Sequence, residues 1–425
     1  MQQDSKKAIV SWAMYDWANS AFATTVIAGF FPIFFKQYWS AGADVNVSTA
    51  RLGDANSLAG IIVAILAPVI GAIADKGTAK RKFLCFFACT GIVMTTSLYL
   101  VAQGNWVLAI GLYVFASVGF EGGNVFYDAL ITGVASEKKM NFVSALGYSF
   151  GYLGGGLLFA INVWMALKPE TFGFADSGEA VRVSFIMVAI WWSLFSIPIA
   201  LFVKEPQTTE AVPGLKAVKA GLQQLLQTFQ EVSHIKNILL FLLAYWLYID
   251  GVHTIVRMAV DYGISIGFDS NDLIVALLIT QFVGFPAAIA FGFIGSKIGA
   301  KRGIFLAIAV YLGIAVWGAF IQQERDFYIL AVIIGLVQGG IQALSRSFYA
   351  KIIPIEKSAE YFGFYNMLGK FAAVLGPFLM GRAGLLVRFF GGSSDLASRV
   401  SIASLSLLFL SGAIIFSFVN EEKVR

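Results

Sequence analysis

The sequence predicts an all-α membrane protein with twelve transmembrane helices, arranged as two pseudo-symmetric bundles of six. Hydrophobic residues make up 58% of the 425 residues, charged residues only 13%, and the mean hydropathy is +0.77. A soluble domain carries about 25% charged residues. Apolar stretches of about 20 residues, each enough to span the hydrocarbon core of a bilayer, recur along the chain and leave no room for a large soluble domain.

The apolar stretches occur in two sets, separated by a polar break. We predict the first six spans at 12–36, 54–74, 83–102, 106–134, 141–166 and 181–203. We predict the second six at 237–263, 271–294, 303–321, 326–350, 359–389 and 399–419. The domains are then a first bundle at 1–203, a cytoplasmic linker at 204–236 and a second bundle at 237–425. Apolar residues recur every three or four positions between Leu215 and Val232, which predicts an amphipathic helix that connects the halves or, alternatively, binds a partner.

The basic residues predict the orientation of the chain. With the N-terminus in the cytoplasm, the inner segments hold nineteen Lys and Arg residues, and the outer loops and their margins hold six. Because basic loops stay inside, we expect both termini to be cytoplasmic. The first apolar stretch lacks a small-residue cleavage pattern, so we interpret it as a retained helix. The short loops are typical of bacteria, and we expect a monomer in the bacterial inner membrane.

The two halves carry a similar loop at the same place in their topology. GAIADKGTAKRK at 71–82 and GFIGSKIGAKRG at 292–303 match at an offset of 221 residues, and the same offset carries Glu121 onto Gln342. Paired six-helix halves with a site at the membrane midplane are a transporter arrangement. The repeat therefore favours a transporter over other membrane proteins.

Several predicted spans carry polar side chains at spacings that place them on one helix face. Charges inside a membrane are costly, so these faces should meet protein or water and not lipid. The substrate-binding candidates on them are Asp16, Asn19, Glu121, Asn124, Asp250, His253, Arg257, Gln338, Gln342 and Lys370. The alternatives are that these groups only hold helices together, and that Asp16 lies at the headgroup boundary. For Glu121 and Lys370, which fall near mid-depth, we favour a functional role.

Other chemistry has little support in the sequence. No Walker A or HExxH motif occurs, and two histidines with two cysteines do not make a zinc site of the usual spacing. Cys85 and Cys89 lie in one apolar helix, which is typical of packing residues. The net charge of +5 is divided among short loops, so it does not indicate nucleic-acid binding. We expect no enzyme activity, no metal and no cofactor, and we expect the partners to be a small solute, protons and the lipid bilayer.

Several motifs resemble those of a known transporter family. The loop GAIADKGTAKRK looks like the signature loop of the major facilitator superfamily. YDWANSAF at 15–22, YIDGVHTI at 248–255 and QALSRSFY at 342–349 resemble its vacuolar amino-acid effluxer-like branch, whose bacterial members are often filed as "unknown major facilitator". The resemblance covers nearly the whole chain. It implies the major facilitator fold, alternating access, small solutes such as amino acids, and a cavity lined by helices one, four, seven and ten.

The resemblance and the predicted depths also indicate gating residues. In the signature loop, the resemblance implies that Asp75, Lys76 and Arg81 latch the cytoplasmic side, and Ser296 in the second copy argues against a matching latch there. Asp128 and Arg346 fall at similar depths in opposite halves, so we expect them to pair when the inner side is closed. The alternative is that each of the two bonds within its own half.

The charges suggest the kind of solute. The first half offers acids and the second half mostly bases, tempered by Asp250, which suits a zwitterion. We predict a secondary active transporter that moves a small polar or zwitterionic solute, such as an amino acid or small peptide, with Glu121 as the candidate proton site. The alternatives are an exporter of hydrophobic drugs or lipids, and a sensor or scaffold that no longer transports. An intramembrane enzyme is disfavoured because Glu121 and Asp128 are about 10 Å apart along their helix.

Overall fold

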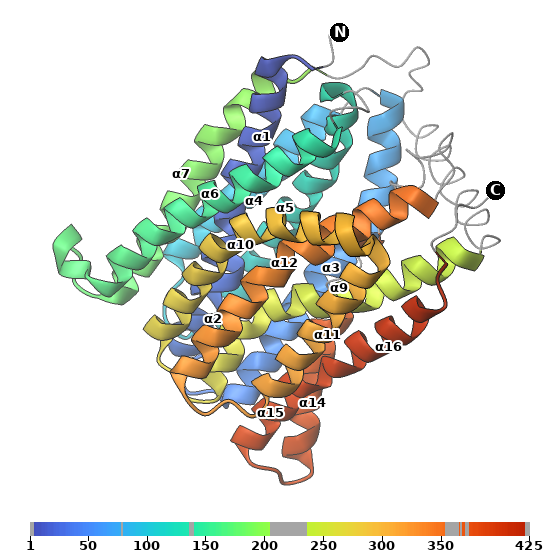
Figure 1. Cartoon of the computed structure of the whole chain (residues 1–425). Helices are drawn as coiled ribbons and strands as arrows, with labels where there is room; N and C mark the ends of the chain where they lie inside the picture. Colours follow the sequence, from blue (N-terminus) through green and yellow to red (C-terminus); the bar gives the residue numbers. More distant parts are fainter. Residues whose placement is uncertain are drawn as a thin grey trace. The chain divides into compact units, whose positions relative to one another are not determined.

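In a computed structural model of the protein, every described element is a helix (Figure 1). The structure describes residues 4–77, 80–135, 140–204, 236–352, 365, 368–369 and 374–420. Up to the linker the elements are α1 (Lys6–Ala21), η1 (Phe22–Phe30), α2 (Phe31–Phe34), η2 (Phe35–Trp39), α3 (Val45–Gly77), α4 (Lys80–Ser97), η3 (Leu98–Leu100), α5 (Trp106–Val134), α6 (Met140–Leu167), η4 (Pro169–Phe172) and α7 (Ser177–Phe202). After it they are α9 (Lys236–Ser265), α10 (Ser270–Ile298), α11 (Ala300–Gly318), α12 (Glu324–Ile352), α14 (Leu375–Phe389), α15 (Ser394–Ser404) and α16 (Ser406–Ser417).

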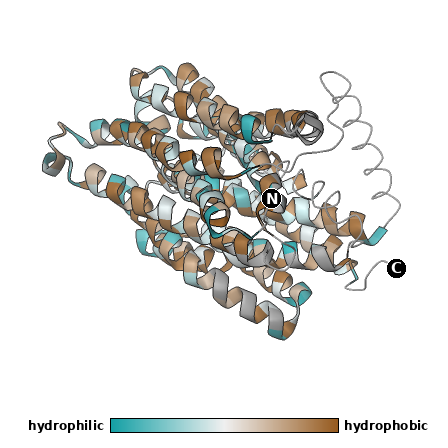
Figure 2. Cartoon of the chain, turned by 90° about the horizontal axis from the view of Figure 1, so that it is seen from above, coloured by the Kyte–Doolittle hydropathy of each residue, from teal (hydrophilic) through white to brown (hydrophobic). Residues whose placement is uncertain are grey.

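The helices have the length and composition of membrane spans. Among the described residues, ten helices or continuous helix runs are long and apolar enough to cross a membrane. They are hydrophobic over most of their length (Figure 2). The two other predicted spans, 54–74 and 359–389, fall partly on residues or side chains that are not described. The all-α membrane class is confirmed, and the cytoplasmic position of the termini stays a prediction.

The first span, Lys6–Trp39, is a helix in which the wider π form replaces the α form twice. The π segments η1 and η2 flank α2, which contains Pro32 near its start. Proline has no N–H to donate, and its ring crowds the carbonyl group four residues earlier. A wider turn before the proline relieves this crowding. Hydropathy alone predicts a plain helix here.

Contacts within the chain define two compact units. The first unit comprises residues 1–41 and 65–224, and the second comprises 42–64 and 225–425. The first part of α3 therefore groups with the helices that follow the linker. The linker, and with it the predicted amphipathic helix, lies outside the described residues apart from Lys204 and Lys236.

In the first unit, glycines let α6 approach the first span closely. A Cβ on Gly151 would lie 2.6 Å from the Ser20 hydroxyl, and one on Gly155 would lie 2.8 Å from the Thr24 hydroxyl. Small residues at such positions let two helix backbones come together, which is how spanning helices associate in the absence of a hydrophobic driving force. α6 is thereby fixed against the helix that carries Asp16.

In the second unit, aromatic rings from several helices surround the start of α9. Phe241 stacks with Tyr349 of α12 at a centroid distance of 5.4 Å and meets Phe416 of α16 edge-on at 6.1 Å. Tyr245 stacks with Tyr365 at 4.3 Å. Such ring pairs contribute about 0.5–1.5 kcal/mol beyond the area they bury. This packing holds in place the helix that carries the polar face of the seventh predicted span.

Candidate functional site

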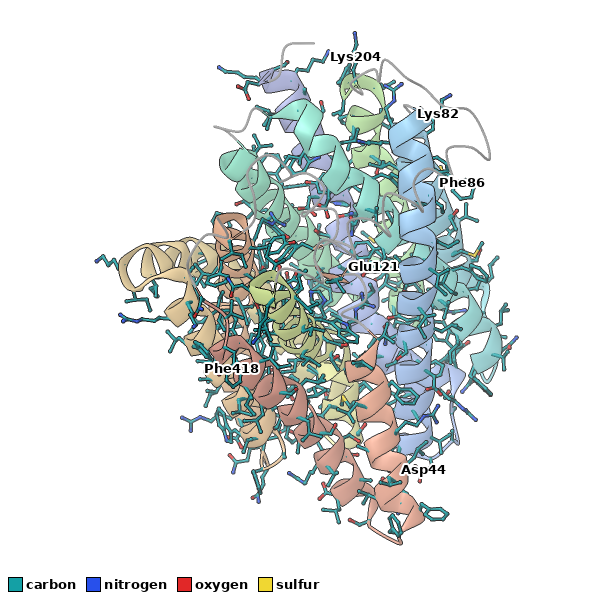
Figure 3. The ribbon with its side chains drawn as sticks, turned by 90° about the vertical axis from the view of Figure 1, so that its right-hand side faces the viewer. Asp44, Lys82, Phe86, Glu121, Lys204 and Phe418 are labelled. Atoms are coloured by element: carbon teal, nitrogen blue, oxygen red, sulfur yellow. The ribbon has the colours of Figure 1, made fainter. Side chains whose placement is uncertain are left out.

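A pair of amide side chains joins α1 to α5 in the first unit. The Asn19 Nδ2 atom donates to Asn124 Oδ1 at 2.5 Å, and Asn19 is only 1% exposed. Glu121 lies one helical turn from Asn124 on α5 and is half-buried. Figure 3 shows Glu121 well inside this unit, away from the end marked by Lys82 and Lys204. The structure therefore brings together two of the predicted residues, with a third on the adjacent turn.

Asp16 meets a different helix from Asn19, although the two are three residues apart. The Ser20 hydroxyl donates to Asp16 Oδ1 at 3.3 Å, and a Cβ on Gly151 of α6 would lie 3.3 Å from the same carboxylate. A carboxylate on a spanning helix is costly unless protein groups or water surround it. Asp16 is half-buried against α6, while Asn19 faces α5.

Replacing either asparagine of the Asn19–Asn124 pair with leucine should destabilise the protein, because the remaining amide is left in the interior without its partner. We expect Asn19→Leu and Asn124→Leu each to lower the free energy of unfolding by about 1–3 kcal/mol. The double variant should lose less than the sum, by about 0.6 kcal/mol or somewhat more. A double-mutant cycle of unfolding in detergent measures this. Strictly additive effects would show that the two amides act independently.

In the second unit, the carboxylate of Asp250 caps the start of α14. Its Oδ2 atom accepts from the backbone N–H of Leu375 and its Oδ1 atom from that of Gly376, both at 2.9 Å. The Thr254 hydroxyl donates to Oδ1 at 3.3 Å, and Asp250 is fully buried. The first N–H groups of a helix have no partner within it and carry the positive end of its dipole, so a carboxylate is stabilised there. Asp250 thus has a structural partner of its own.

Gly376 is what allows this close approach. A Cβ there would overlap the Thr254 hydroxyl and lie 2.7 Å from Asp250 Oδ1. Pro377 follows, and a proline is tolerated in the first turn of a helix because no N–H partner is needed there. The predicted span 359–389 therefore contains the start of a helix at Leu375.

Arg257 extends the polar face of α9 as far as α3. Its Nη1 atom donates to Asn56 Oδ1 at 3.4 Å, and Asn56 Nδ2 donates to the Leu52 carbonyl at 3.1 Å. Arg257 is 8% exposed and Asn56 is fully buried. On the polar face predicted for the seventh span, Asp250 therefore caps α14 and Arg257 contacts α3.

Residues 44–57 are held against α9, α14 and α15 of the second unit, in a set of contacts that we call the α3 clasp. Its polar pairs are Asp44–Arg388 at 3.4 Å, Asn46–Ser398 at 3.1 Å, Thr49–Ser265 at 3.2 Å, Asp54–Arg382 at 2.7 Å and the Ser57 hydroxyl to the Val374 carbonyl at 2.9 Å. The two ion pairs are largely exposed, and such pairs contribute about 0–1 kcal/mol. The backbones also approach closely, since a Cβ on Gly381 would lie 3.1 Å from the Cα of Ala50. Close packing, more than charge, holds the clasp.

The remaining predicted residues are placed singly. Those half-buried on spanning helices are Asp128, His253, Gln342 and Arg346. Gln338 lines a mainly apolar cavity of about 60 Å³ between α9, α10, α11 and α12. Arg81 donates through Nη1 to the Val203 carbonyl at 3.3 Å. The side chains of Asp75, Lys76 and Lys370 lie outside the described residues, so the latch and the role of Lys370 stay predictions. Asp128 and Arg346 belong to different units, and their pairing stays a prediction as well.

The described residues offer little for metal or hydrolytic chemistry. Within the described ranges, no group of three or more His, Cys, Asp or Glu side chains could hold a metal ion. GYSFG at 147–151 has the spacing of the nucleophile turn of hydrolases. It lies inside α6, however, and that motif requires a sharp turn between a strand and a helix. The polar clusters described above instead connect neighbouring helices through hydrogen bonds.

Three residues of these clusters were not predicted as site residues from the sequence. Asn56, Thr254 and Gly376 are not among the predicted site residues, although each contacts one of them or its partner. The sequence does mark two of the three as unusual. Asn56 is a polar residue inside the predicted span 54–74, and Gly376 precedes a proline inside the predicted span 359–389. Arg382, a charge within the predicted span 359–389, is a further signal of function by its position alone.

Comparison with known proteins gives relatives for nearly the whole chain. The profile of the family described as "Vacuole effluxer Atg22 like" matches residues 41–425. The "Uncharacterized MFS-type transporter YxiO" of Bacillus subtilis (strain 168) is 38% identical over 415 residues, which are 97% of this chain and 94% of that protein. "Autophagy-related protein 22" of Eremothecium gossypii is 22% identical over 440 residues, with 89% of this chain and 85% of that protein covered.

Solved structures resemble the whole chain at low sequence identity. A crystal structure of a D-xylose-proton symporter superposes with a TM-score of 0.69 at 13% identity, covering 98% of this chain and 99% of that one. A crystal structure of the nucleoside transporter NupG superposes with a TM-score of 0.68 at 14% identity, covering 96% and 98%. At such identities the similarity concerns the fold, which is that of major facilitator transporters.

Proposed function

The chain belongs to the vacuole effluxer Atg22-like family of the major facilitator superfamily, and we propose that it is a secondary active transporter for a small zwitterionic solute, an amino acid or a small peptide. The family and the fold are those of multi-pass membrane transporters, which confirms the resemblance found in the sequence. Without a Walker A motif in the sequence, an ion gradient is favoured over ATP as the energy source. We propose protons as the coupling ion.

The proposed substrate class rests on the sign of the charged side chains in each unit. The spanning helices of the first unit carry the acids Asp16, Glu121 and Asp128. In the second unit Asp250 is already bonded to the start of α14, so its charge is compensated there. The remaining charges considered on α9 and α12 are the bases His253, Arg257 and Arg346, which outnumber the one further buried acid of α9, Asp261. Acids suit an ammonium group and bases suit a carboxylate, and a zwitterion carries both.

The test is transport by the purified protein in proteoliposomes. A thermal-shift screen of amino acids and small peptides comes first, and uptake of the solutes that stabilise the protein is then measured under an imposed pH gradient. We expect saturable, gradient-driven flux of at least one zwitterion. Flux of a hydrophobic cation such as ethidium, with no zwitterion flux, would favour the drug-exporter alternative. Binding without any flux would favour a sensor, and turnover of a lipid would favour an enzyme.

Glu121 is the group proposed to carry the proton. We expect Glu121→Gln to abolish accumulation driven by a pH gradient while solute exchange continues, because the amide keeps the shape of the carboxyl group but cannot release a proton. Uptake and counterflow in proteoliposomes separate the two activities. The matched control is Glu170→Gln, an exposed acid of η4, which should behave as the parent. Full gradient-driven uptake in Glu121→Gln would rule out this assignment.

We propose the cytoplasmic membrane of a bacterium as the location. The relative from Bacillus subtilis matches almost the full length of the chain, and the loops are short. Fractionation of cells that express the tagged protein, followed by detection in inner-membrane vesicles, tests this.

A further inference from the structure

Basic side chains from three helices come together at one end of the first unit. The Lys7 ammonium lies over the Phe202 ring, 3.6 Å from its centroid. Arg81 donates to the carbonyl of Val203, the next residue. Two contacts therefore bring the basic starts of α1 and α4 to the end of α7, and Lys204 lies two residues beyond that end.

Three cations of this group face outward. Lys6, Lys82 and Lys204 are exposed, and none of the three forms an ion pair within the described residues. Figure 3 shows Lys82 and Lys204 at the same end of the unit. The first turns of α1 and α4 carry no acidic residue, although the positive end of a helix dipole favours acids there. Asp4 lies two residues before α1, but the basic side chains and the helix ends still leave an excess of positive charge at this end of the unit.

Apolar side chains lie just beyond these cations on the same helices. Val10 of α1 is 47% exposed, Phe86 of α4 is 63% exposed and Leu201 of α7 is 61% exposed. Each is about one helical turn deeper along its helix than the nearest of the basic residues. Figure 3 shows Phe86 below Lys82 on α4. A cationic rim therefore adjoins an apolar surface.

We propose that this surface, formed by Lys6, Lys82 and Lys204 with Val10, Phe86 and Leu201, is a binding site for an anionic phospholipid of the adjacent leaflet. The phosphate of such a lipid meets the ammonium groups, and its acyl chains cover the apolar side chains below. A zwitterionic lipid offers the same chains, but its headgroup also carries a positive charge, which the cations repel. The chemistry of this surface is independent of the transported solute.

The test is native mass spectrometry of the full-length protein, titrated with phosphatidylglycerol or with phosphatidylcholine of identical acyl chains. We expect the protein to retain phosphatidylglycerol preferentially. The triple variant Lys6→Gln, Lys82→Gln, Lys204→Gln should weaken that binding by about fivefold for each cation removed. Replacement of the same three residues with arginine should keep it, and this variant also controls for correct folding.

The matched control removes two exposed cations elsewhere, as Lys168→Gln with Arg325→Gln, and should bind as the parent does. Equal retention of the two lipids by the parent protein, or unchanged binding in the triple glutamine variant, would overturn the proposal. Complete displacement of the lipid by inorganic phosphate would also overturn it, because the site would then be one for a soluble anion.

Discussion

Gly376→Ala is expected to destabilise the second unit strongly and to remove transport activity. The added Cβ would overlap the Thr254 hydroxyl and press on the Asp250 carboxylate, so α14 could not keep its cap. Overpacking costs about 1–3 kcal/mol, and weakening hydrogen bonds to a charged group costs about 1.5–3 kcal/mol more. We therefore expect the free energy of unfolding to fall by about 2.5–6 kcal/mol. Thermal unfolding in detergent, monitored by size-exclusion chromatography, measures the loss of stability.

A glycine in open surroundings provides the control for this experiment. Gly313 lies inside α11 of the same unit, and nothing lies within 4 Å of the position its Cβ would take. Gly313→Ala should therefore unfold at the parent's temperature or slightly above it. Asp250→Asn, which keeps one carbonyl oxygen as an acceptor, should fall between Gly376→Ala and the parent. If Gly376→Ala were as stable as Gly313→Ala, the cap on α14 would not have the role assigned to it.

A disulfide across the α3 clasp is expected to stop transport reversibly. Ala50 of α3 and Gly381 of α14 are close enough for Ala50→Cys with Gly381→Cys to cross-link, since a Cβ on Gly381 would lie 3.1 Å from the Ala50 Cα. α3 passes from one unit to the other near Ile65. The resemblance to major facilitator transporters implies alternating access, and we expect the clasp to open in each such cycle, which a covalent link would prevent. We expect oxidation to remove more than about nine-tenths of the flux, a loss on the scale of a full conformational block.

The cross-linking experiment needs a chain without other cysteines, and it needs single-cysteine controls. Cys85 and Cys89 are free cysteines, and both are first replaced with serine. Each single cysteine variant, oxidised in the same way, should keep its flux, and a reductant should restore the flux of the double variant. A cross-linked protein that transports at the parent rate would show that the clasp stays closed throughout the cycle.

Hydropathy was sufficient to predict most of the helices, although α3 begins at Val45, nine residues before the predicted span 54–74. The predicted span 106–134 coincides with α5 (Trp106–Val134), and 141–166 falls within α6 (Met140–Leu167). The reason is that the hydrocarbon core leaves a long apolar segment no alternative to the helix. The quoted motifs were likewise sufficient for the family, because they depend on the order of residues and not on their positions in space.

The tertiary structure decided which neighbour each polar face meets. Helical spacing places Asp16 with Asn19, and Asp250 with Arg257, on one face, but a face can pack on any helix that lies beside it. Asn19 pairs with α5 while Asp16 meets α6, and Asp250 caps α14. These partners lie more than a hundred residues apart in the chain, so periodicity carries no information about them.

The sequence by itself therefore determined the class, the spans and the family of this protein, because each depends on composition and local order. Only the tertiary structure decided the α3 clasp and the function of Gly376. The hydropathy of α3 gives no sign that residues 42–64, which include its first part, group with the second unit. The need for a glycine at 376 arises from the positions of Thr254 and Asp250 on another helix, and such a close approach is set by backbones packing in three dimensions.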